Sequence, residues 1–534
     1  MVSAHPYTPR RISNDFFGID VGLRGNALLA VITASCASGF LLVGYDNGVM
    51  GGLVNGEEFK RTFNTNDANT LGNIVSLYEI GCFFGALATF VVGDYLGRRR
   101  TILISSIFMV AGAIIQAACN DVGVMIAGRI ISGLGMGAIN STVPVLQAET
   151  APATSRGKLA AVSLTILNVG IVLSYWIDYA FAVTLTGNVI WRVPIALQCV
   201  FIGGLVLATL IIPETPRWLA KKGRHEEAIA VLERLHNASI DSPEVQQSYA
   251  GIQQALEHER AASNTGWSFL VKEDSIRSRR RLLLACFIQA AQQLSGINAL
   301  IYYSGTLFAK SVRLSDAQSA VMAGGLNMCL ILGSTISYFL IDRVGRKALL
   351  IPCIAGMSAV MCVQTGLVKV IQEGTGGAIY GRAAAAMLFV FEFFFSLGFQ
   401  ATVWLIPSEV LPLLIRTKGS ALSTASNWIF NFAIVKFTPS ALDNIGWKTY
   451  IIFAVLNAAW VPIIYFFLPE TANRTLEEMD EIFAKDNWQI DQSHAAADTK
   501  AAAHRNTDME YADDTGSNKG SYKNEQTVTS TLDR

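Results

Sequence analysis

Two groups of side-chain amides lie in apolar stretches of the sequence, where a polar group needs a partner. Gln292, Gln293 and Asn298 fall close together in one stretch, and Asn427 and Asn431 fall in another. The second pair is four residues apart and therefore shares one face of a helix. Each amide offers both a donor and an acceptor, which suits an uncharged ligand with several hydroxyl groups. Hydrogen bonding between helices is the alternative use of such amides.

A glycine interrupts the first group of amides. A regular helix would spread the three amides around its surface, whereas a break at Gly296 would turn them toward one cavity. Tyr302 and Tyr303 follow this break, and we expect them to close the outer end of the cavity or else to serve in packing.

Ionisable residues also occur inside apolar stretches. Asp46 and Arg129 are two of them, and Glu79 and Glu392 are two more. A charge at the centre of a bilayer costs roughly 2.5–3.5 kcal/mol, so such residues are functional by default. A permanent structural ion pair is the alternative for Asp46 and Arg129. The two glutamates are candidates for a second proton or substrate site, or for structural acids.

Membrane helices are the elements that must position these residues. The chain has 534 residues, of which 51% are hydrophobic and only 15% charged, against about 25% charged in a soluble protein. Twelve segments are long and apolar enough to cross a bilayer. They span residues 27–54, 71–93, 101–120, 123–146, 159–183, 191–212, 282–309, 316–341, 347–372, 382–407, 419–441 and 447–468. The fifth and eleventh are the weakest, because they carry Asp178 and Lys436.

Basic residues set the expected orientation. Of the 41 Lys and Arg residues, 31 fall on the side that holds both termini and the central loop, and 8 fall on the other. This bias predicts cytoplasmic termini, with an N-terminal segment at 1–26 and a tail at 469–534. The central loop, 213–281, has helical spacing at 226–235 and 243–260, and Ser242 is a plausible N-cap. The tail after about residue 486 has a disordered composition.

Short motifs recur in the same order in the two halves of the chain. The pairs are Asp94-Tyr-Leu-Gly-Arg-Arg99 with Asp342-Arg-Val-Gly-Arg-Lys347, Glu149…Arg156 with Glu409…Arg416, and Pro213-Glu-Thr with Pro469-Glu-Thr. The offset between partners is nearly constant, which indicates a duplication. We therefore expect two six-helix halves, 27–212 and 282–468, with a ligand near mid-membrane between them.

Acidic and basic residues of these motifs can pair at the inner membrane face. We expect salt bridges there that hold the inner ends of the halves together when the cavity opens outward. Anchoring to lipid headgroups is the alternative. The residues are Asp94, Arg98, Glu149, Arg156, Asp342, Arg346, Glu409 and Arg416.

Several classes of function are disfavoured. The eight cysteines lie in apolar stretches without metal-site or redox spacing, and all six histidines lie outside the predicted spans. We find no nucleotide-binding loop and no Ser-His-Asp arrangement, so we expect no enzyme and no cofactor or metal. The formal net charge is zero, and nothing suggests a nucleic-acid partner.

Taken together, the motifs resemble the sugar porter family of the major facilitator superfamily over about residues 27–485. The matching stretches are Gly44-Tyr-Asp46, Gly93-Asp-Tyr-Leu-Gly-Arg-Arg99, Gly128-Arg129, Pro213-Glu-Thr-Pro-Arg217, Gln292-Gln-Leu-Ser-Gly-Ile-Asn298 and Pro469-Glu-Thr-Ala-Asn-Arg-Thr-Leu-Glu-Glu478. Tyr78-Glu-Ile-Gly-Cys82, Ser174-Tyr-Trp-Ile-Asp178 and Ser426-Asn-Trp-Ile-Phe-Asn431 resemble fungal members around the yeast glycerol–proton symporter. The resemblance implies an all-α membrane protein with the major facilitator fold.

The resemblance also implies roles for individual residues. In the family, the two amide groups bind the sugar ring, Asn327 matches another binding amide, and Trp404 matches an aromatic that stacks on the sugar. Asp46 and Arg129 match a pair whose acid is the coupling site in proton symporters. Several positions depart from the family pattern, two of them at the expected binding site. The proline-rich helix-ten motif is replaced by Gln400-Ala-Thr-Val-Trp404, and the helix-five glutamine aligns with Leu164.

These features lead to one functional hypothesis. The resemblance implies a plasma-membrane carrier of a monosaccharide, hexose or pentose, or of a polyol, which works by alternating access with proton symport. The two departures favour a pentose, a polyol or an unusual sugar over glucose. A uniporter and a transporter-like nutrient sensor are the alternatives. The expected partners are the substrate, a proton and the lipid bilayer, with the chain as a monomer.

Overall fold

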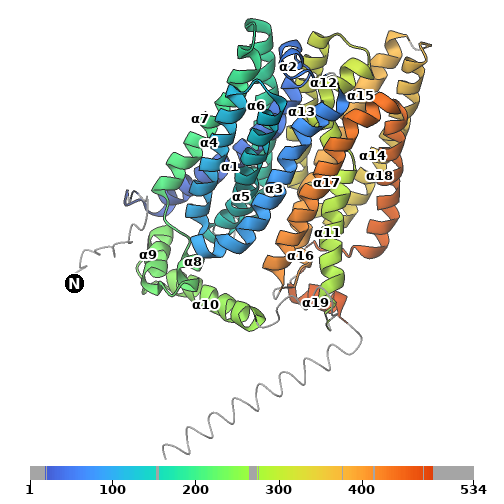
Figure 1. Cartoon of the computed structure of the whole chain (residues 1–534). Helices are drawn as coiled ribbons and strands as arrows, with labels where there is room; N and C mark the ends of the chain where they lie inside the picture. Colours follow the sequence, from blue (N-terminus) through green and yellow to red (C-terminus); the bar gives the residue numbers. More distant parts are fainter. Residues whose placement is uncertain are drawn as a thin grey trace, which may run out of the picture.

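The protein is a bundle of long, roughly aligned helices with smaller helices gathered at one end (Figure 1). The computed structural model describes residues 19, 21–65, 67–151, 156–263, 274, 276–375, 377–412, 415–472, 474 and 476–484. At 156–161, 258–263, 310, 316, 342, 417, 476 and 477 the description covers the backbone and not the side chain.

The first half of the chain forms six long helices. They are α1 (Gly25–Leu53), α3 (Ala68–Leu96), α4 (Arg98–Ala118), α5 (Val122–Thr150), α6 (Arg156–Thr184) and α7 (Val189–Ile211). Each matches a span predicted from hydropathy. A short helix that the sequence did not predict, α2 (Glu57–Phe63), follows α1.

The second half repeats this plan with two interrupted spans. Its helices are α11 (Ser278–Leu294), α12 (Ile297–Lys310), α13 (Asp316–Val344), α14 (Arg346–Gln372), α15 (Ala378–Phe394), the π-helix η2 (Phe395–Gln400), α16 (Ala401–Val410), α17 (Arg416–Asn444) and α18 (Lys448–Phe467). The seventh predicted span is α11 with α12, and the tenth is α15, η2 and α16.

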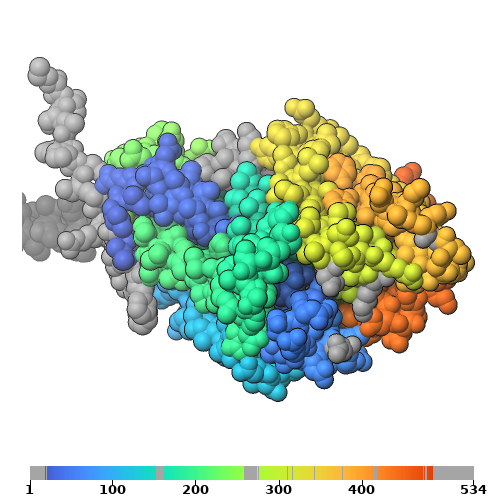
Figure 2. All heavy atoms as spheres, turned by 90° about the horizontal axis from the view of Figure 1, so that it is seen from above, coloured from blue at the N-terminus to red at the C-terminus, as the bar shows by residue number. Residues whose placement is uncertain are grey.

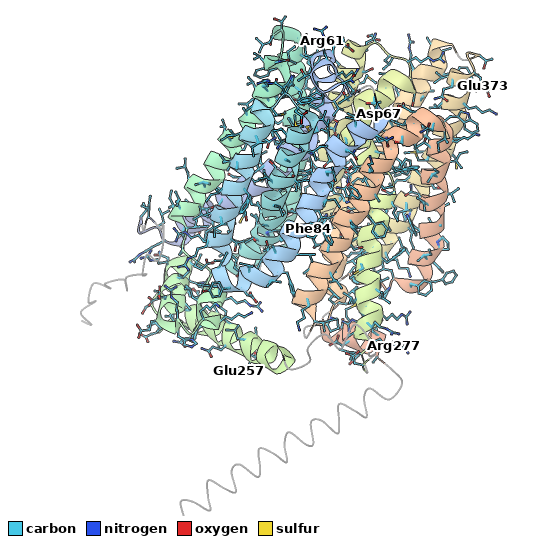
Figure 3. All side chains as sticks on the ribbon, in the orientation of Figure 1. Arg61, Asp67, Phe84, Glu257, Arg277 and Glu373 are labelled. Carbon is cyan, nitrogen blue, oxygen red and sulfur yellow. The ribbon has the colours of Figure 1, made fainter. Side chains whose placement is uncertain are left out.

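Eleven helical stretches among the described residues are long and apolar enough to cross a membrane. The twelfth predicted span is α17, which is 29 residues long but carries amides and Lys436 along its length. The chain is therefore a multi-pass membrane protein with twelve long helical passes. Large apolar side chains on the outside fit this environment, and Phe84, labelled midway along the bundle in Figure 3, is 55% exposed.

The smaller helices include those predicted in the central loop. They are α8 (Pro216–Lys221), α9 (His225–His236), α10 (Pro243–Ser263) and α19 (Leu476–Phe483). The predicted N-cap is confirmed, since the Val245 amide donates to the Ser242 hydroxyl at 3.4 Å. We call this end of the bundle the loop-domain end and the opposite end, which carries α2, the α2 end (Figure 1).

The duplicated Pro-Glu-Thr motifs cap a helix in each half. Glu214 accepts hydrogen bonds from the first two backbone amides of α4, at 3.0 and 3.1 Å. Glu470 does the same for α14, at 2.8 and 3.0 Å. The preceding Gly97 and Gly345 have φ of 91° and 103°, which glycine adopts without strain. Burial raises the pKa of Glu214, against the lowering effect of these amides.

Small residues bring α3 and α5 into backbone contact. A Cβ atom added at Gly133 would lie 2.3 Å from the carbonyl oxygen of Tyr78, and one at Gly137 would lie 2.0 Å from that of Cys82. Larger side chains would push the two helices apart. This close crossing places the side chains of Tyr78 and Glu79 beside those that α5 carries.

The two halves lie side by side in the plane of the membrane. Seen from above, the blue-to-green residues of the first half and the yellow-to-orange residues of the second occupy opposite sides of the molecule (Figure 2). Each half has its own hydrophobic core, and residues of α6 also join the core of the second half.

Candidate functional site

The predicted break at Gly296 is present. Helix α11 ends at Leu294 and α12 begins at Ile297, with φ of 95° at Gly296 between them. A Cβ atom at this position would lie 2.7 Å from the Phe453 ring. The break therefore depends on glycine twice, for its backbone conformation and for the space beside α18.

The break brings amides of α11 and α12 onto amides of α17. Gln293 donates to the side-chain oxygen of Asn427 at 2.9 Å. Asn298 donates to Gln293 at 2.6 Å and to Asn431 at 2.6 Å. Four of the residues predicted from spacing therefore form one hydrogen-bonded chain.

The amide chain continues through Gln292 and one residue that sequence reasoning missed. Asn427 donates to Gln289 at 2.7 Å and to Gln292 at 3.0 Å. Gln289 also donates to the carbonyl of Val403 at 3.3 Å, which links the chain to α16. Gln289 lies four residues before Gln293 on the same helix face, so its position relative to Gln293 was the signal for it.

We define the amide cluster as Gln289, Gln292, Gln293, Asn298, Asn427 and Asn431. Most of its side chains are buried, with Gln293 only 6% exposed and Asn427 2% exposed, while Asn298 is half-buried. The cluster holds no charged group. Each buried amide is stabilised by its neighbours, and a ligand hydroxyl can replace a neighbour because it both donates and accepts.

Two predicted binding residues are not joined to this cluster by a hydrogen bond in the described part of the chain. The Asn327 amide donates to the Ala323 carbonyl of its own helix at 2.9 Å, and its side-chain oxygen is buried without a partner. Trp404 is half-buried on α16, next to the Val403 carbonyl that Gln289 contacts. Their roles remain predictions.

Asp46 and Arg129 form the predicted pair, from α1 and α5. The guanidinium lies 3.7 Å from the carboxylate, and both side chains are fully buried. The guanidinium also lies over the Tyr78 ring, 4.1 Å from its centre. Within the described structure, neither carboxylate oxygen of Asp46 and no guanidinium nitrogen of Arg129 has a hydrogen bond. The pair is therefore a loose ion contact.

The two predicted gate tyrosines are both buried at the α2 end. The Tyr302 hydroxyl lies 2.7 Å from an oxygen of Glu79 and 3.1 Å from that of Asn47, so it connects α12 with α3 and α1 of the other half. Tyr303 donates to the carbonyl of Val435 at 3.0 Å within its own half. Of these two tyrosines, Tyr302 is the one that joins the halves.

Further hydrogen bonds join the halves at the α2 end. Thr306 donates to Asn55 at 2.6 Å, and Lys436 donates to Asn73 at 2.6 Å. Lys436, which made the eleventh span weak in sequence, therefore has a polar partner across the interface. Together with Tyr302, these contacts connect the two halves at the α2 end.

A reciprocal pair of amides joins the halves nearer the middle of the bundle. Gln400 donates to Asn168 at 2.7 Å, and Asn168 donates back at 3.2 Å. Asn168 also lies 3.1 Å from the Ser334 hydroxyl and from the Leu330 carbonyl. Sequence reasoning noticed Gln400 as a departure from the family motif but did not find its partner.

The loop charges form salt bridges within each half. Arg98 contacts Asp94 at 3.2 Å and Glu149 at 2.9 Å, all in the first half. Arg346 contacts Glu409 at 3.0 Å in the second. These bridges brace helices of one half at the loop-domain end, where the chain reverses between α3 and α4 or α13 and α14. Their predicted role as a latch between the halves remains a prediction.

Three further residues of the eight predicted loop charges either make a different contact or have side chains outside the described residues. Arg416 donates to the carbonyl of Leu411 at 3.2 Å. The side chains of Arg156 and Asp342 lie outside the described residues. No group of three or more potential metal ligands is found in the described part of the chain.

A sequence profile of the family described as "Sugar (and other) transporter" matches residues 30–483. The chain belongs to this family. Among relatives, "MFS-type transporter oryC" of Aspergillus oryzae is 37% identical over 467 residues, which cover 86% of each chain. "Sugar transporter STL1" of Saccharomyces cerevisiae is 36% identical, covering 87% of this chain and 83% of its own. "Quinate permease" of Emericella nidulans is 32% identical, covering 83% and 86%.

Solved structures confirm the fold of this family member. The proton:xylose symporter XylE bound to 6-bromo-6-deoxy-D-glucose superposes with a TM-score of 0.72 at 22% identity. That match covers 86% of this chain and 100% of XylE. An inward-open structure of XylE from E. coli gives a TM-score of 0.70. The chain therefore has the major facilitator fold that its sequence motifs predicted.

Proposed function

We propose that this chain carries a neutral, hydroxyl-rich substrate, a monosaccharide or a polyol, across the plasma membrane by alternating access together with a proton. The observation that carries the proposal is the amide cluster, a buried chain of uncharged donors and acceptors between α11, α12 and α17. In this proposal the cluster binds the substrate, with Asn327 and Trp404 completing the site.

The chemistry of the cluster favours an uncharged substrate. Its donors and acceptors already satisfy one another, so a substrate must offer both kinds of group to replace a partner without leaving a buried polar group unpaired. Hydroxyl groups do this, whereas a carboxylate only accepts. Relatives named for sugar transport support this class, and one named for quinate, a hydroxy acid, defines the comparison to test.

Proton coupling is assigned to Asp46 with Arg129. A proton on Asp46 removes the charge that holds the guanidinium, so proton occupancy can favour one conformation over another. Because both side chains are fully buried, the neutral and charged forms differ strongly in energy. One charge moving across 100 mV supplies about 2.3 kcal/mol, which is enough to concentrate a substrate by more than tenfold.

The orientation follows from the basic residues. We place the loop-domain end in the cytoplasm, because it holds most of the Lys and Arg residues outside the helices. The α2 end then faces outward, and Tyr302 and Tyr303 lie at the outer gate. The loop salt bridges lie at the inner face, where they would latch the halves in an outward-open state.

Uptake by a host that lacks its own sugar carriers tests the proposal. Labelled hexoses, pentoses and polyols, with quinate as the charged comparison, are offered with and without a protonophore to wild type and Asp46→Asn. We expect a neutral substrate to accumulate above equilibrium, and we expect this accumulation to be lost with the protonophore or the substitution. Entry that only equilibrates in both variants would indicate a uniporter. No entry with the protein at the surface would indicate a sensor.

A further inference from the structure

Glu79 lies between three groups to which the proposed function gives separate roles: the ion pair, the outer gate and the amide cluster. Its side chain is fully buried on α3. It interacts with Arg129 and Asp46 of the ion pair, with Tyr302 of the outer gate and with Asn431 of the amide cluster. The ionisable groups facing it from the packed helices are Asp46 of α1, Tyr78 and Cys82 of α3, Arg129 of α5, and Tyr302 and Tyr303 of α12.

The hydrogen bonds around Tyr302 are short of one proton. Its hydroxyl has a single hydrogen, yet it lies 2.7 Å from an oxygen of Glu79 and 3.1 Å from the side-chain oxygen of Asn47. The second carboxylate oxygen of Glu79 is buried without a hydrogen bond. With Glu79 ionised, the single Tyr302 hydrogen therefore serves either Glu79 Oε1 or the Asn47 oxygen, and the other of these two stays unfilled, as does Glu79 Oε2.

A proton on Glu79 completes this group. The protonated carboxyl donates to the Tyr302 oxygen, and the tyrosine hydrogen becomes available to Asn47. The chain Glu79–Tyr302–Asn47 then runs from α3 through α12 to α1 with each hydrogen used once. Since α12 belongs to the opposite half from α1 and α3, the added hydrogen bond holds the halves together at the α2 end.

We propose that Glu79 is a second proton-binding site, separate from Asp46, and that its occupation closes the α2 end. A proton from the outer solution binds the carboxylate as the gate closes, and it leaves when the gate opens. The inference rests on the proposed proton-coupled function for its direction, because a symporter must close its outer side after taking up a proton. It also gives the substrate a connection to the gate, through Asn431 and Asn298.

The competing explanation for the hydrogen bonds of Tyr302 is that the Asn47 side-chain amide is rotated by half a turn, so that its nitrogen and oxygen change places. If its nitrogen faced Tyr302, it would donate to the tyrosine oxygen while the tyrosine donated to Glu79, and closure would need no proton. The two explanations predict different pH behaviour of the gate. Under the competing explanation, wild-type closure does not respond to pH in the range where Glu79 titrates.

Spin labels across the α2 end measure closure directly and need no substrate. Arg61 and Glu373 are exposed on opposite halves at that end (Figure 3), and each is replaced by cysteine after the native cysteines that are not buried have been removed. We expect pulsed EPR to show a short distance at acidic pH and a growing long-distance population as the pH rises. The open-to-closed ratio changes by about fivefold, the effect of one net hydrogen bond.

Matched variants decide the assignment. Glu79→Gln has the shape of the protonated acid and a donor, so it should keep the short distance at every pH. Tyr302→Phe should lose the part of the pH response that comes from Glu79, and Asp46→Asn should keep that part. A wild type without a response, a Glu79→Gln variant that responds like wild type, or an Asp46→Asn variant that loses the response would overturn the proposal. None of these distance measurements depends on finding a transported substrate. A failure of the carrier hypothesis would therefore be detected separately, in the uptake assay.

Discussion

Asn427 is the most connected side chain of the amide cluster. It accepts from Gln293 and donates to both Gln289 and Gln292, so its removal leaves several buried polar atoms without partners. If these atoms also contact the substrate, Asn427→Ala should raise KM by about tenfold to a hundredfold, the usual effect of losing one or two hydrogen bonds in a buried site. Labelled uptake over a range of substrate concentrations measures this change.

A buried asparagine outside the cluster provides the control. Asn457 of α18 donates to the carbonyls of Ser295 and Phe453, and in the described part of the chain it makes no hydrogen bond to a cluster amide. Asn457→Ala should lower thermal stability while leaving KM within about twofold of wild type. Equal rises in KM for both variants would show that the cluster is structural.

At the level of single residues, the sequence predicted the amide cluster but not all of its members. Gln292, Gln293 and Asn298 were predicted from the break at Gly296 that follows the glutamines, and Asn427 and Asn431 because residues four apart share a helix face. Gln289 obeys the same rule and could have been included. The partner of Gln400 could not, because Asn168 lies 232 residues away and no local pattern relates the two.

At the level of the helix, the main feature is the break between α11 and α12. Gly296→Ala forces a side chain into a left-handed backbone and toward the Phe453 ring, at 2.7 Å. We expect a loss of about 2 kcal/mol or more in stability, together with a weaker substrate site, since the break orients the amides. Thermal unfolding of the purified protein, followed by fluorescence, measures the first effect.

Gly366→Ala is the matched glycine control. Gly366 lies inside α14, and a Cβ atom there meets nothing within 4 Å. Alanine is the better helix former by about 0.5–1 kcal/mol, so this variant should melt at or above the wild-type temperature. If Gly296→Ala behaved like Gly366→Ala, the break would not depend on glycine.

Helix prediction succeeded where elements were long and failed where they were short. The twelve spans were recognisable because a bilayer requires about 20 apolar residues. The short helices α2 and α8 give too few turns for a periodic signal, and the π-helix η2 continues the apolar pattern of α15. The polar character of α17 weakened its signal because its amides face α11 and α12 and Lys436 faces the other half, rather than lipid.

The way the two halves meet is a property of the whole molecule, and the Asn168–Gln400 pair is one of the contacts that join them. Reciprocal amides on opposite halves must separate if the halves rock apart at this level. Asn168→Ala should therefore weaken the conformation seen here and raise the population open at the α2 end by about fivefold. The spin labels at Arg61 and Glu373 give that population.

A double-mutant cycle then asks whether the two amides act as one contact. Because each is the other's partner, Gln400→Ala should add little once Asn168 is alanine, with a coupling energy of about 1 kcal/mol or more. Gln116→Ala is the control, since Gln116 bonds to Ser132 within the first half and its loss should leave the distance unchanged. Additive effects of Asn168→Ala and Gln400→Ala, or an equal shift with Gln116→Ala, would mean that the pair does not set the balance between the two states. Coupling confined to the pair would instead show that Gln400, in the segment that replaces the family's proline-rich motif, holds the halves together through Asn168.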